Sequence, residues 1–275
     1  MTPASTFPVR PPRDSSASTQ EAALPFQSTP ISDPADPRVE PFLQVRERDL
    51  VGRRGMFIAE GEVVLAAADR VGRLAELIGD QALDAPVYVA EQAVMDAIVG
   101  FPIHRGLLGV GRRRAAPEPE DLLTTLGREA LVAVVHGIGN HDNMGGLFRN
   151  AAAFGVDAVL LDATSCDPLY RKAIRVSVGA VLITPFARLA SEADLLSLLI
   201  AQGFEAVALT PSGTQDLATY APAAKTAVLF GAEGPGLPSE LLRGCKTVRI
   251  PMAGGFDSLN VATTSGIVLH HLRNA

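Results

Sequence analysis

Apolar runs separated by segments of helical spacing predict a parallel sheet from about residue 129 onwards. Residues 130–135 (ALVAVV) form a continuous apolar run, which is typical of a strand buried on both faces. Five later runs also predict strands: AVLLD (158–162), AVLIT (180–184), EAVAL (205–209), AVLFG (227–231) and TVRI (247–250). The segments between them predict helices, among them residues 144–155, 168–179, 192–203 and 238–244 and a terminal helix from Ser258. This alternation is that of crossover helices on a parallel sheet.

A shorter α/β pattern precedes this sheet, at residues 39–114. MFIAEG (56–61), APVYVA (85–90) and RGLLGVGRR (105–113) read as strands. The apolar spacing over residues 61–79 predicts one long helix, and residues 91–100 predict a second helix that ends at Gly100. The spacing therefore indicates a small separate α/β domain.

Proline marks two breaks in the pattern. Residues 1–38 are rich in Pro, Ser and Thr and show no apolar periodicity, so we expect a disordered arm. Residues 115–128 contain Pro117 and Pro119 and read as a linker, whose acidic residues favour the start of a helix. Residues 129–275 then form the larger domain.

Composition excludes several classes of protein. With 275 residues and 47% hydrophobic content, the chain can bury one or two cores. Two cysteines, Cys166 and Cys245, make no disulfide framework and no metal-spaced pair, which suits a reducing cytoplasm. The apolar runs are too short to span a bilayer, and we see no secretion signal at the N-terminus. The net charge of −6 does not by itself indicate nucleic-acid binding.

Common catalytic motifs are missing from the sequence. HGIGNHDNMGG after the first long strand has G-x-G but Asp142 at the third glycine position, so a dinucleotide fingerprint fails. There is no P-loop, GxSxG or HExxH, and we expect no metal site. Three glycine-bearing loops remain, at the carboxyl ends of predicted strands, where open α/β sheets bind ligands. They are HDNMGGLFRNA (141–151), LFGAEGPGL (229–237) and IPMAGGFDSLN (250–260).

These three loops resemble, in order and spacing, the signature motifs of the SpoU/TrmH family of RNA ribose 2'-O-methyltransferases, in the SPOUT class. The resemblance rests on NMGGLFRNAAAFG, FGAEGPGL and IPMAGGFDSLNVATTSGI, helped by VSVGAV (176–181), and covers roughly residues 130–275. Residues 39–114, with FIAEG and HRGLLGV, more loosely resemble the ribosomal-protein-like substrate-binding domain of many members.

The resemblance implies an α/β fold with a C-terminal trefoil-knotted parallel sheet and a smaller N-terminal α/β substrate-binding domain. General topology rules would have given an ordinary doubly wound sheet instead. It also implies S-adenosylmethionine as the cofactor, RNA as the substrate and a homodimer formed through the knot domain.

The resemblance implies catalytic roles for Arg149, Asn143, Glu233, Ser258 and Asn260. Arg149 corresponds to the arginine of the first motif; some accounts make it the general base. Because guanidinium groups stay protonated, we assign it to phosphate positioning and stabilisation of the developing alkoxide. Asn143 would orient Arg149 or cap its helix, and Glu233, otherwise a turn residue, would hold Arg149 or Asn260. Ser258 and Asn260 would face the ribose.

The resemblance places cofactor contacts mainly on backbone groups around an apolar slot, which suits an adenine. The residues implied are Leu209, Thr210, Gly231, Glu233, Gly234, Ile250, Met252, Leu259 and Ala262. Core packing is the alternative for Ile250 and Leu259. RNA contact needs positive charge, and arginines concentrate in the first domain and linker: Arg46, Arg48, Arg53, Arg54, Arg105, Arg112, Arg113 and Arg114. A solvated face is the alternative for this set.

The leading hypothesis is therefore a 2'-O-methyltransferase acting on ribosomal RNA, with transfer RNA as the runner-up. A non-catalytic RNA-binding or assembly factor with the same fold is the alternative of a different class. A small-molecule enzyme on an ordinary dinucleotide-binding sheet is disfavoured by the missing fingerprint. The presence of Asn143, Arg149, Glu233, Ser258 and Asn260 favours an active enzyme.

Overall fold

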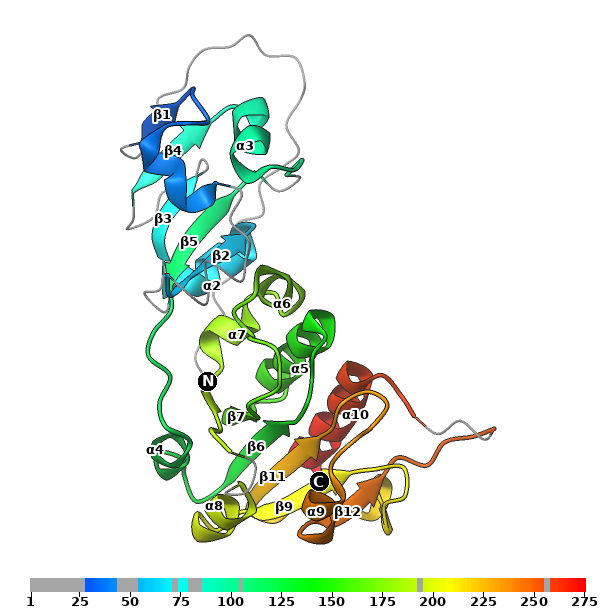
Figure 1. Cartoon of the computed structure of the whole chain (residues 1–275). Helices are drawn as coiled ribbons and strands as arrows, with labels where there is room; N and C mark the ends of the chain where they lie inside the picture. Colours follow the sequence, from blue (N-terminus) through cyan, green and yellow to red (C-terminus); the bar gives the residue numbers. More distant parts are fainter. Residues whose placement is uncertain are drawn as a thin grey trace.

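The chain folds into two α/β domains that contact each other (Figure 1). The structure is a computed structural model, and it describes residues 28–43, 54–70, 74–78, 86–103, 106–191, 195–254 and 258–275. The arginines Arg46, Arg48, Arg53 and Arg105 lie outside these ranges. None of the helices in the described part of the chain has both the length and the hydropathy that crossing a membrane requires.

The N-terminal domain is a mixed five-stranded sheet of order β1-β4-β3-β5-β2. Its strands are β1 (Thr29–Ile31), β2 (Met56–Glu60), β3 (Leu74–Ile78), β4 (Val87–Ala90) and β5 (Leu108–Arg112). The 3-10 helix η1 (Pro37–Phe42) and α3 (Gln92–Val99) cover one core, and α2 (Glu62–Arg70) lies toward the second domain. Gly100 ends α3 in the left-handed conformation, as predicted.

Two predictions for this domain were wrong. The arm expected through residue 38 already carries β1, because residues 29–31 pair in parallel with β4. The helix expected over 61–79 ends at Arg70, and Leu74–Ile78 form β3 instead. Both segments gain backbone hydrogen bonds from strands distant in sequence, which local spacing does not register.

The C-terminal domain is a seven-stranded sheet of order β10-β12-β9-β11-β6-β7-β8, and every pair in it is parallel. The strands are β6 (Ala130–Val135), β7 (Ala158–Leu161), β8 (Phe186–Arg188), β9 (Glu205–Leu209), β10 (Gln215–Asp216), β11 (Lys225–Phe230) and β12 (Lys246–Arg249). The predicted parallel sheet is thus confirmed. The trefoil path of the chain stays a prediction, because strand order alone does not establish it.

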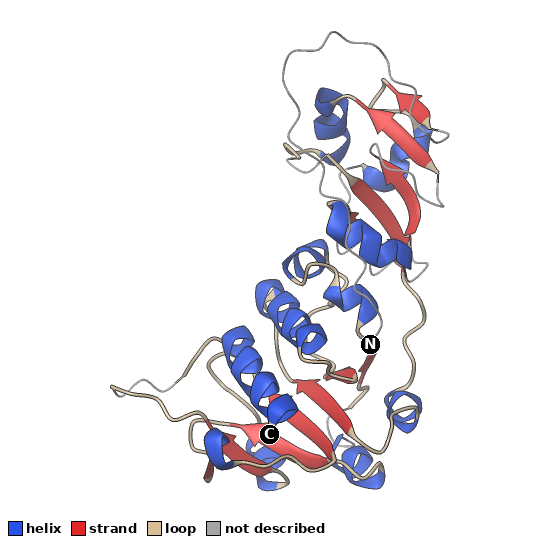
Figure 2. Ribbon diagram, turned by 180° about the vertical axis from the view of Figure 1, so that it is seen from behind, coloured by secondary structure: helices blue, strands red, loops and turns tan. Residues whose placement is uncertain are grey.

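Helices pack on both faces of this sheet (Figure 2). One face meets α5 (His141–Ala153) and α10 (Val261–Asn274); the other meets α4 (Pro119–Thr124), α8 (Leu195–Ala201) and α9 (Ser239–Arg243). Alternate residues of β6 enter the two cores, so all six are buried. Leu122 and Leu123 of α4 are buried, so the predicted linker contributes a helix to the second core.

The strand predicted at 180–184 is instead a short helix, α7 (Ala180–Ile183), after α6 (Arg171–Val176). Gly179 adopts φ +81° and turns the chain tightly, and Thr184 N donates to Ala180 O at 2.9 Å. The strand forms only beyond Pro185, as β8. A short continuous apolar run fits a helix as well as a strand, which explains the error.

Asp162, directly after β7, holds the loop that leads into α5. Its buried carboxylate accepts hydrogen bonds from Gly137 N (3.0 Å), Ser165 N (2.9 Å) and Thr164 N (3.0 Å), and from the Ser165 and Thr164 hydroxyls. Burial acts to raise the pKa of this group, but the hydrogen bonds outweigh it and lower the pKa to about 2. Asp162 therefore stabilises the fold as an anion.

We predict that Asp162→Asn lowers the free energy of unfolding by about 2–3 kcal/mol at neutral pH, because donors in the loop lose a charged acceptor. The native pKa lies below the unfolded one, so this stabilisation exists above pH 3.8 and is lost as the pH falls toward 2. Urea unfolding across that range measures it. The matched Asp142→Asn variant, at a half-exposed ion pair with Lys172, should cost under about 1 kcal/mol. Equal losses for both variants would contradict the prediction.

Candidate functional site

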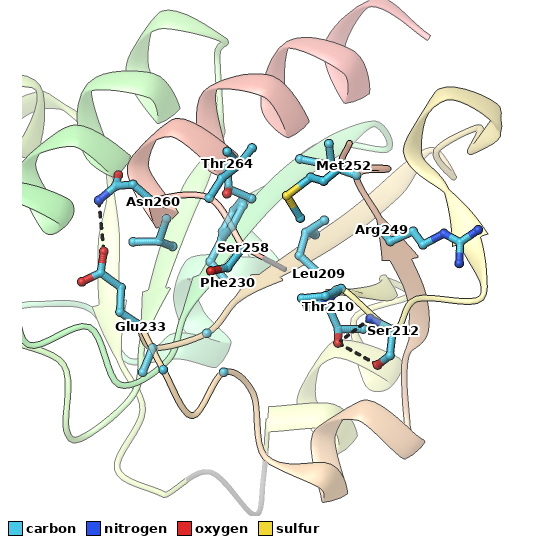
Figure 3. A pocket seen from close by; sticks show the side chains of 18 of the residues that line it. Leu209, Thr210, Ser212, Phe230, Glu233, Arg249, Met252, Ser258, Asn260 and Thr264 are labelled. Carbon is cyan, nitrogen blue, oxygen red and sulfur yellow. Dashed lines mark hydrogen bonds between the residues drawn. The ribbon is translucent and has the colours of Figure 1, made fainter. Parts of the chain in front are cut away.

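A cavity of about 790 Å³ opens at the carboxyl ends of β9, β11 and β12, beside the start of α10 (Figure 3). It is lined by Leu209, Thr210, Pro211, Ser212, Phe230, Gly231, Ala232, Glu233, Gly234, Gly236, Val248, Arg249, Ile250, Met252, Ser258, Leu259, Asn260, Val261 and Thr264. Its size lies within the range of small-molecule sites. The position agrees with the edge where parallel sheets bind ligands.

Eight of the nine residues predicted for the cofactor line this cavity: Leu209, Thr210, Gly231, Glu233, Gly234, Ile250, Met252 and Leu259. Ala262 does not. Its methyl group instead lies 2.7 Å from where a Cβ on Gly146 would stand, and its carbonyl accepts a hydrogen bond from Asn150 at 2.7 Å. Ala262 therefore packs α10 onto α5.

The loop that follows β11 needs its glycines to form this wall. Gly231 lies so close to the loop's far side that an added Cβ would be 2.5 Å from the carbonyl carbon of Gly236. Gly236 N donates to Ala232 O at 3.0 Å, and Gly234 and Gly236 have φ of +87° and +72°. The loop thus folds back on itself and presents backbone groups and Glu233 at the cavity.

Asn260 joins the three predicted motif loops through one side chain. Its Oδ1 accepts from Ala262 N (2.9 Å) and Thr263 N (3.2 Å), which caps α10. Its Nδ2 donates to Asn143 Oδ1 (2.8 Å) and to Glu233 Oε1 (3.0 Å; Figure 3). The expected pairing of Glu233 with Asn260 is present.

Asn143 takes neither of the two roles expected for it, which were to orient Arg149 or to cap α5. The cap of α5 is Asn140, whose side chain accepts from Asp142 N at 2.8 Å. Asn143 is only 5% exposed and faces Asn260 across the gap between α5 and α10. It connects the two helices and neither caps α5 nor contacts Arg149.

Arg149 is exposed on α5 and is not among the residues that line the cavity. Within the described ranges, no ion pair is formed by its guanidinium group. The glycines beside it, Gly145 and Gly146, serve helix packing. A Cβ at Gly145 would be 2.7 Å from Ala173 O of α6, and one at Gly146 would meet α10. The structure therefore brings four of the five predicted catalytic residues together and leaves Arg149 facing outward.

Several lining residues escaped the sequence reasoning. Phe230 is buried and lines the cavity, and its signal was its place at the end of an apolar strand just before Gly231. Thr264 lies one helical turn after Asn260, so its spacing could have found it. Arg249 carried no such signal; its Nε donates to Asp216 at 2.6 Å, and its side chain extends away from Ser258 in Figure 3.

The lining is compatible with a nucleoside-type cofactor. Leu209, Phe230, Ile250 and Leu259 give an apolar slot, while the loops around Thr210 and Gly231 supply backbone groups. In the part of the chain that the structure describes, there is no cluster of three or more His, Cys, Asp and Glu side chains suited to a metal ion.

The arginines predicted for RNA contact differ in their surroundings. Arg54 is paired with Glu40 through hydrogen bonds of 2.9 and 2.6 Å, which raises its pKa. Arg113 forms an ion pair with Asp167. Arg112 and Arg114 are exposed at the end of β5 and the start of the connection between domains.

Comparison with known proteins gives a consistent set of relatives. The model of the SpoU rRNA Methylase family matches residues 130–270. A protein of Mycobacterium bovis named as a tRNA/rRNA methyltransferase is 41% identical over 263 residues, covering 87% of this chain and 90% of the relative. A 23S rRNA (guanosine-2'-O-)-methyltransferase of Vibrio vulnificus is 30% identical over 60% of this chain and 68% of its own length. The AdoMet-bound crystal structure of an rRNA methyltransferase from Sinorhizobium meliloti has a TM-score of 0.74 at 26% identity, covering 89% of this chain and 97% of that chain.

We predict that Asn260→Asp weakens the contacts with Glu233 although it keeps the cap of α10. Aspartate caps a helix as well as asparagine does, but it cannot donate to Glu233 and opposes its charge. We expect a loss of about 1–2 kcal/mol in the free energy of unfolding. Adding Glu233→Gln provides a donor that faces the new carboxylate, so the double variant should regain part of the lost free energy of unfolding. Urea unfolding of the wild type, the two single variants and the double variant measures the coupling between positions 233 and 260. Strictly additive effects would count against the hydrogen-bonded junction.

Proposed function

Because the chain belongs to the SpoU rRNA methylase family of RNA methyltransferases, we propose that it methylates a ribose 2'-hydroxyl of ribosomal RNA with S-adenosylmethionine. The observation that carries the proposal is the junction of Asn143, Asn260 and Glu233 at the mouth of a cavity of about 790 Å³. The related structure bound to AdoMet supports the choice of cofactor.

When bound, the cofactor supplies an activated methyl group on a sulfonium. The ribose oxygen would take this methyl group, the cofactor would leave as a neutral thioether, and the hydroxyl proton would pass to solvent. The enzyme must align these atoms and stabilise negative charge on the oxygen as it develops. We assign the apolar slot and the glycine loop to binding the cofactor, Ser258 to orienting the ribose, and Asn260 to holding together the loops that face it.

Arg149 supplies positive charge to the RNA in this scheme. A guanidinium stays protonated, so it positions a phosphate and stabilises the developing alkoxide but does not act as a base. Because Arg149 faces outward, we propose that the active site is completed in a homodimer. The exposed apolar residues Leu259 (42% exposed), just before α10, and Ile267 (41%), in the middle of α10, support such an interface. Sedimentation velocity distinguishes a dimer from a monomer.

Incubation of the protein with ribosomal RNA and isotope-labelled S-adenosylmethionine tests the function directly. Mass spectrometry of the digested nucleosides then locates the label on the ribose or on the base. Label on a base would refute the 2'-hydroxyl, and label only on transfer RNA would favour that substrate. Tight RNA binding with no transfer to any RNA would favour a non-catalytic assembly factor. Under either function, we place this chain in the cytoplasm.

We predict that Arg149→Ala lowers kcat for RNA methylation by about 10²–10³-fold, the usual effect of removing one stabilising donor. Affinity for S-adenosylmethionine should not change, because Arg149 does not line the cavity. Calorimetry and single-turnover kinetics measure the two quantities. The matched Arg243→Ala variant removes an exposed arginine at the end of α9 and should keep full kcat. A loss of cofactor affinity in Arg149→Ala, or equal kcat in both variants, would contradict the assignment.

We also predict that Arg112→Ala weakens RNA binding through loss of a phosphate contact. The substitution should reduce the slope of log affinity against log salt by about 1. Arg54→Ala is the comparison, since Glu40 already neutralises that arginine, and its effect should be smaller. Filter binding over a range of salt concentrations measures the slopes. Equal slopes in both variants, like that of the wild type, would assign these arginines to a solvated face.

A further inference from the structure

A buried carboxylate links the two domains. Glu60, at the end of β2, is only 7% exposed, and its Oε2 accepts from Arg171 Nε (3.3 Å) and Nη2 (3.1 Å) on α6. Arg175, one turn further along α6, approaches the same oxygen at 3.9 Å. A buried carboxylate without its cationic partner is strongly destabilising, so this contact favours one arrangement of the domains.

Arg171 makes a second contact with the N-terminal domain. Its guanidinium carbon lies 4.2 Å from the centre of the Phe101 ring, which follows α3. The side chain of Arg171 is 21% exposed. A planar guanidinium can pair with a carboxylate at its edge and stack on a ring with its face, and a lysine cannot do both. Arg171 is therefore suited to fix an orientation as well as to neutralise a charge.

Apolar packing accompanies this ionic contact. Gly179, between α6 and α7, is so close to α2 that an added Cβ would lie 3.0 Å from Ala67 Cβ and 3.4 Å from Val64 Cα. The core on the α5 face of the large sheet continues into Phe57, Val64 and Leu65 of the N-terminal domain. A shared apolar core opposes the free relative motion that two domains otherwise show.

The turn at this junction has an unusual backbone. Val178 has φ +55°, a conformation that a β-branched residue rarely adopts, and it precedes Gly179 at φ +81°. Such a conformation persists where surrounding contacts determine it. The turn stands directly before α7, which packs on α2 of the neighbouring domain.

The opposite side of α6 is bound to α5, the helix that carries Asn143 and Arg149. The ring of Tyr170 lies 4.4 Å from that of His141, and Lys172 pairs with Asp142 at 2.7 Å. Gly145 admits the carbonyl of Ala173. Helix α6 thus contacts the N-terminal domain through one set of side chains and the first turns of α5 through another. In Figures 1 and 2 it lies between the two domains.

We propose that Glu60 and Arg171 are positioning residues that hold the N-terminal domain at one orientation on α6, so that RNA bound there reaches the cavity at a fixed place. This inference rests on the proposed function. It predicts that loosening the junction impairs use of RNA and leaves use of the cofactor intact, because no residue of the junction lines the cavity.

Two glycines provide a matched test. Gly179→Ala strains a positive φ and pushes against α2, whereas Gly203→Ala strains a similar φ of +76° with no neighbour within 4 Å. Arg171→Ala removes the ionic contact with Glu60. Arg171→Lys keeps the positive charge but loses the two-nitrogen contact with Glu60 and the stacking on Phe101. Hydrogen exchange of residues 62–70 in the full chain reports on docking whether or not RNA is methylated. Steady-state kinetics with RNA and S-adenosylmethionine then separate the two Michaelis constants.

We expect Gly179→Ala and Arg171→Ala to speed exchange in residues 62–70 and to lower kcat/KM for RNA by about 10–100-fold, mostly through KM for RNA. KM for S-adenosylmethionine should be unchanged in both variants. The exchange rate and kcat/KM for RNA of Arg171→Lys should lie between those of Arg171→Ala and the wild type, and those of Gly203→Ala should match the wild type. Faster exchange with an unchanged KM for RNA would overturn the proposal, as would unchanged exchange. If the wild-type protein methylates no RNA, the proposed function fails, and exchange alone decides whether the junction holds the domains together.

Discussion

The side chain of Asn260 is the contact on which the candidate site depends. A single amide accepts two backbone N–H groups in the first turn of α10 and donates to both Asn143 and Glu233. Asparagine combines acceptor and donor on a short planar group, while aspartate lacks the donor and serine lacks the reach for all four partners. The position of α10, the glycine loop after β11 and the first turns of α5 are therefore fixed together.

That junction requires α10 to lie close to α5, where a Cβ on Gly146 would be 2.7 Å from Ala262 Cβ, and the small residues of α10 allow this approach. The run VATTSG forms helices poorly in isolation, yet Ser265 is fully buried and accepts a hydrogen bond from Asn150 at 2.9 Å. A Cβ on Gly266 would lie 3.3 Å from Asn150 Nδ2. Larger side chains with better helix propensity would separate the helices and break the contact between Asn143 and Asn260. Tertiary packing replaces the missing intrinsic preference.

The sequence predicted the large sheet well, because strands buried on both faces appear as continuous apolar runs, which can be recognised without knowing the neighbouring strand. It predicted the lining of the cavity because the three loops resemble known motifs and stand at strand ends. It failed where the decisive partner is distant. Nothing local pairs residues 29–31 with β4, makes residues 180–183 helical after Gly179, or turns Asn143 toward Asn260. Ala262 was assigned to the cofactor, although its small size serves the contact with Gly146.

Helix α5 connects the domain junction with the candidate site, because one of its sides packs on α10 and the other on α6. Toward α10 it offers Asn143, Gly146 and Asn150, which hold α10 and Asn260 in place; toward α6 it offers His141, Asp142 and Gly145. A shift of α6 would therefore be transmitted to the residues that face the proposed ribose, since a helix of 13 residues moves as a unit. The domain that we propose binds RNA packs on α6, and α6 packs on α5, which joins the loops at the cavity. The separation of the two is therefore set by packing between helices and not by the length of the connecting chain.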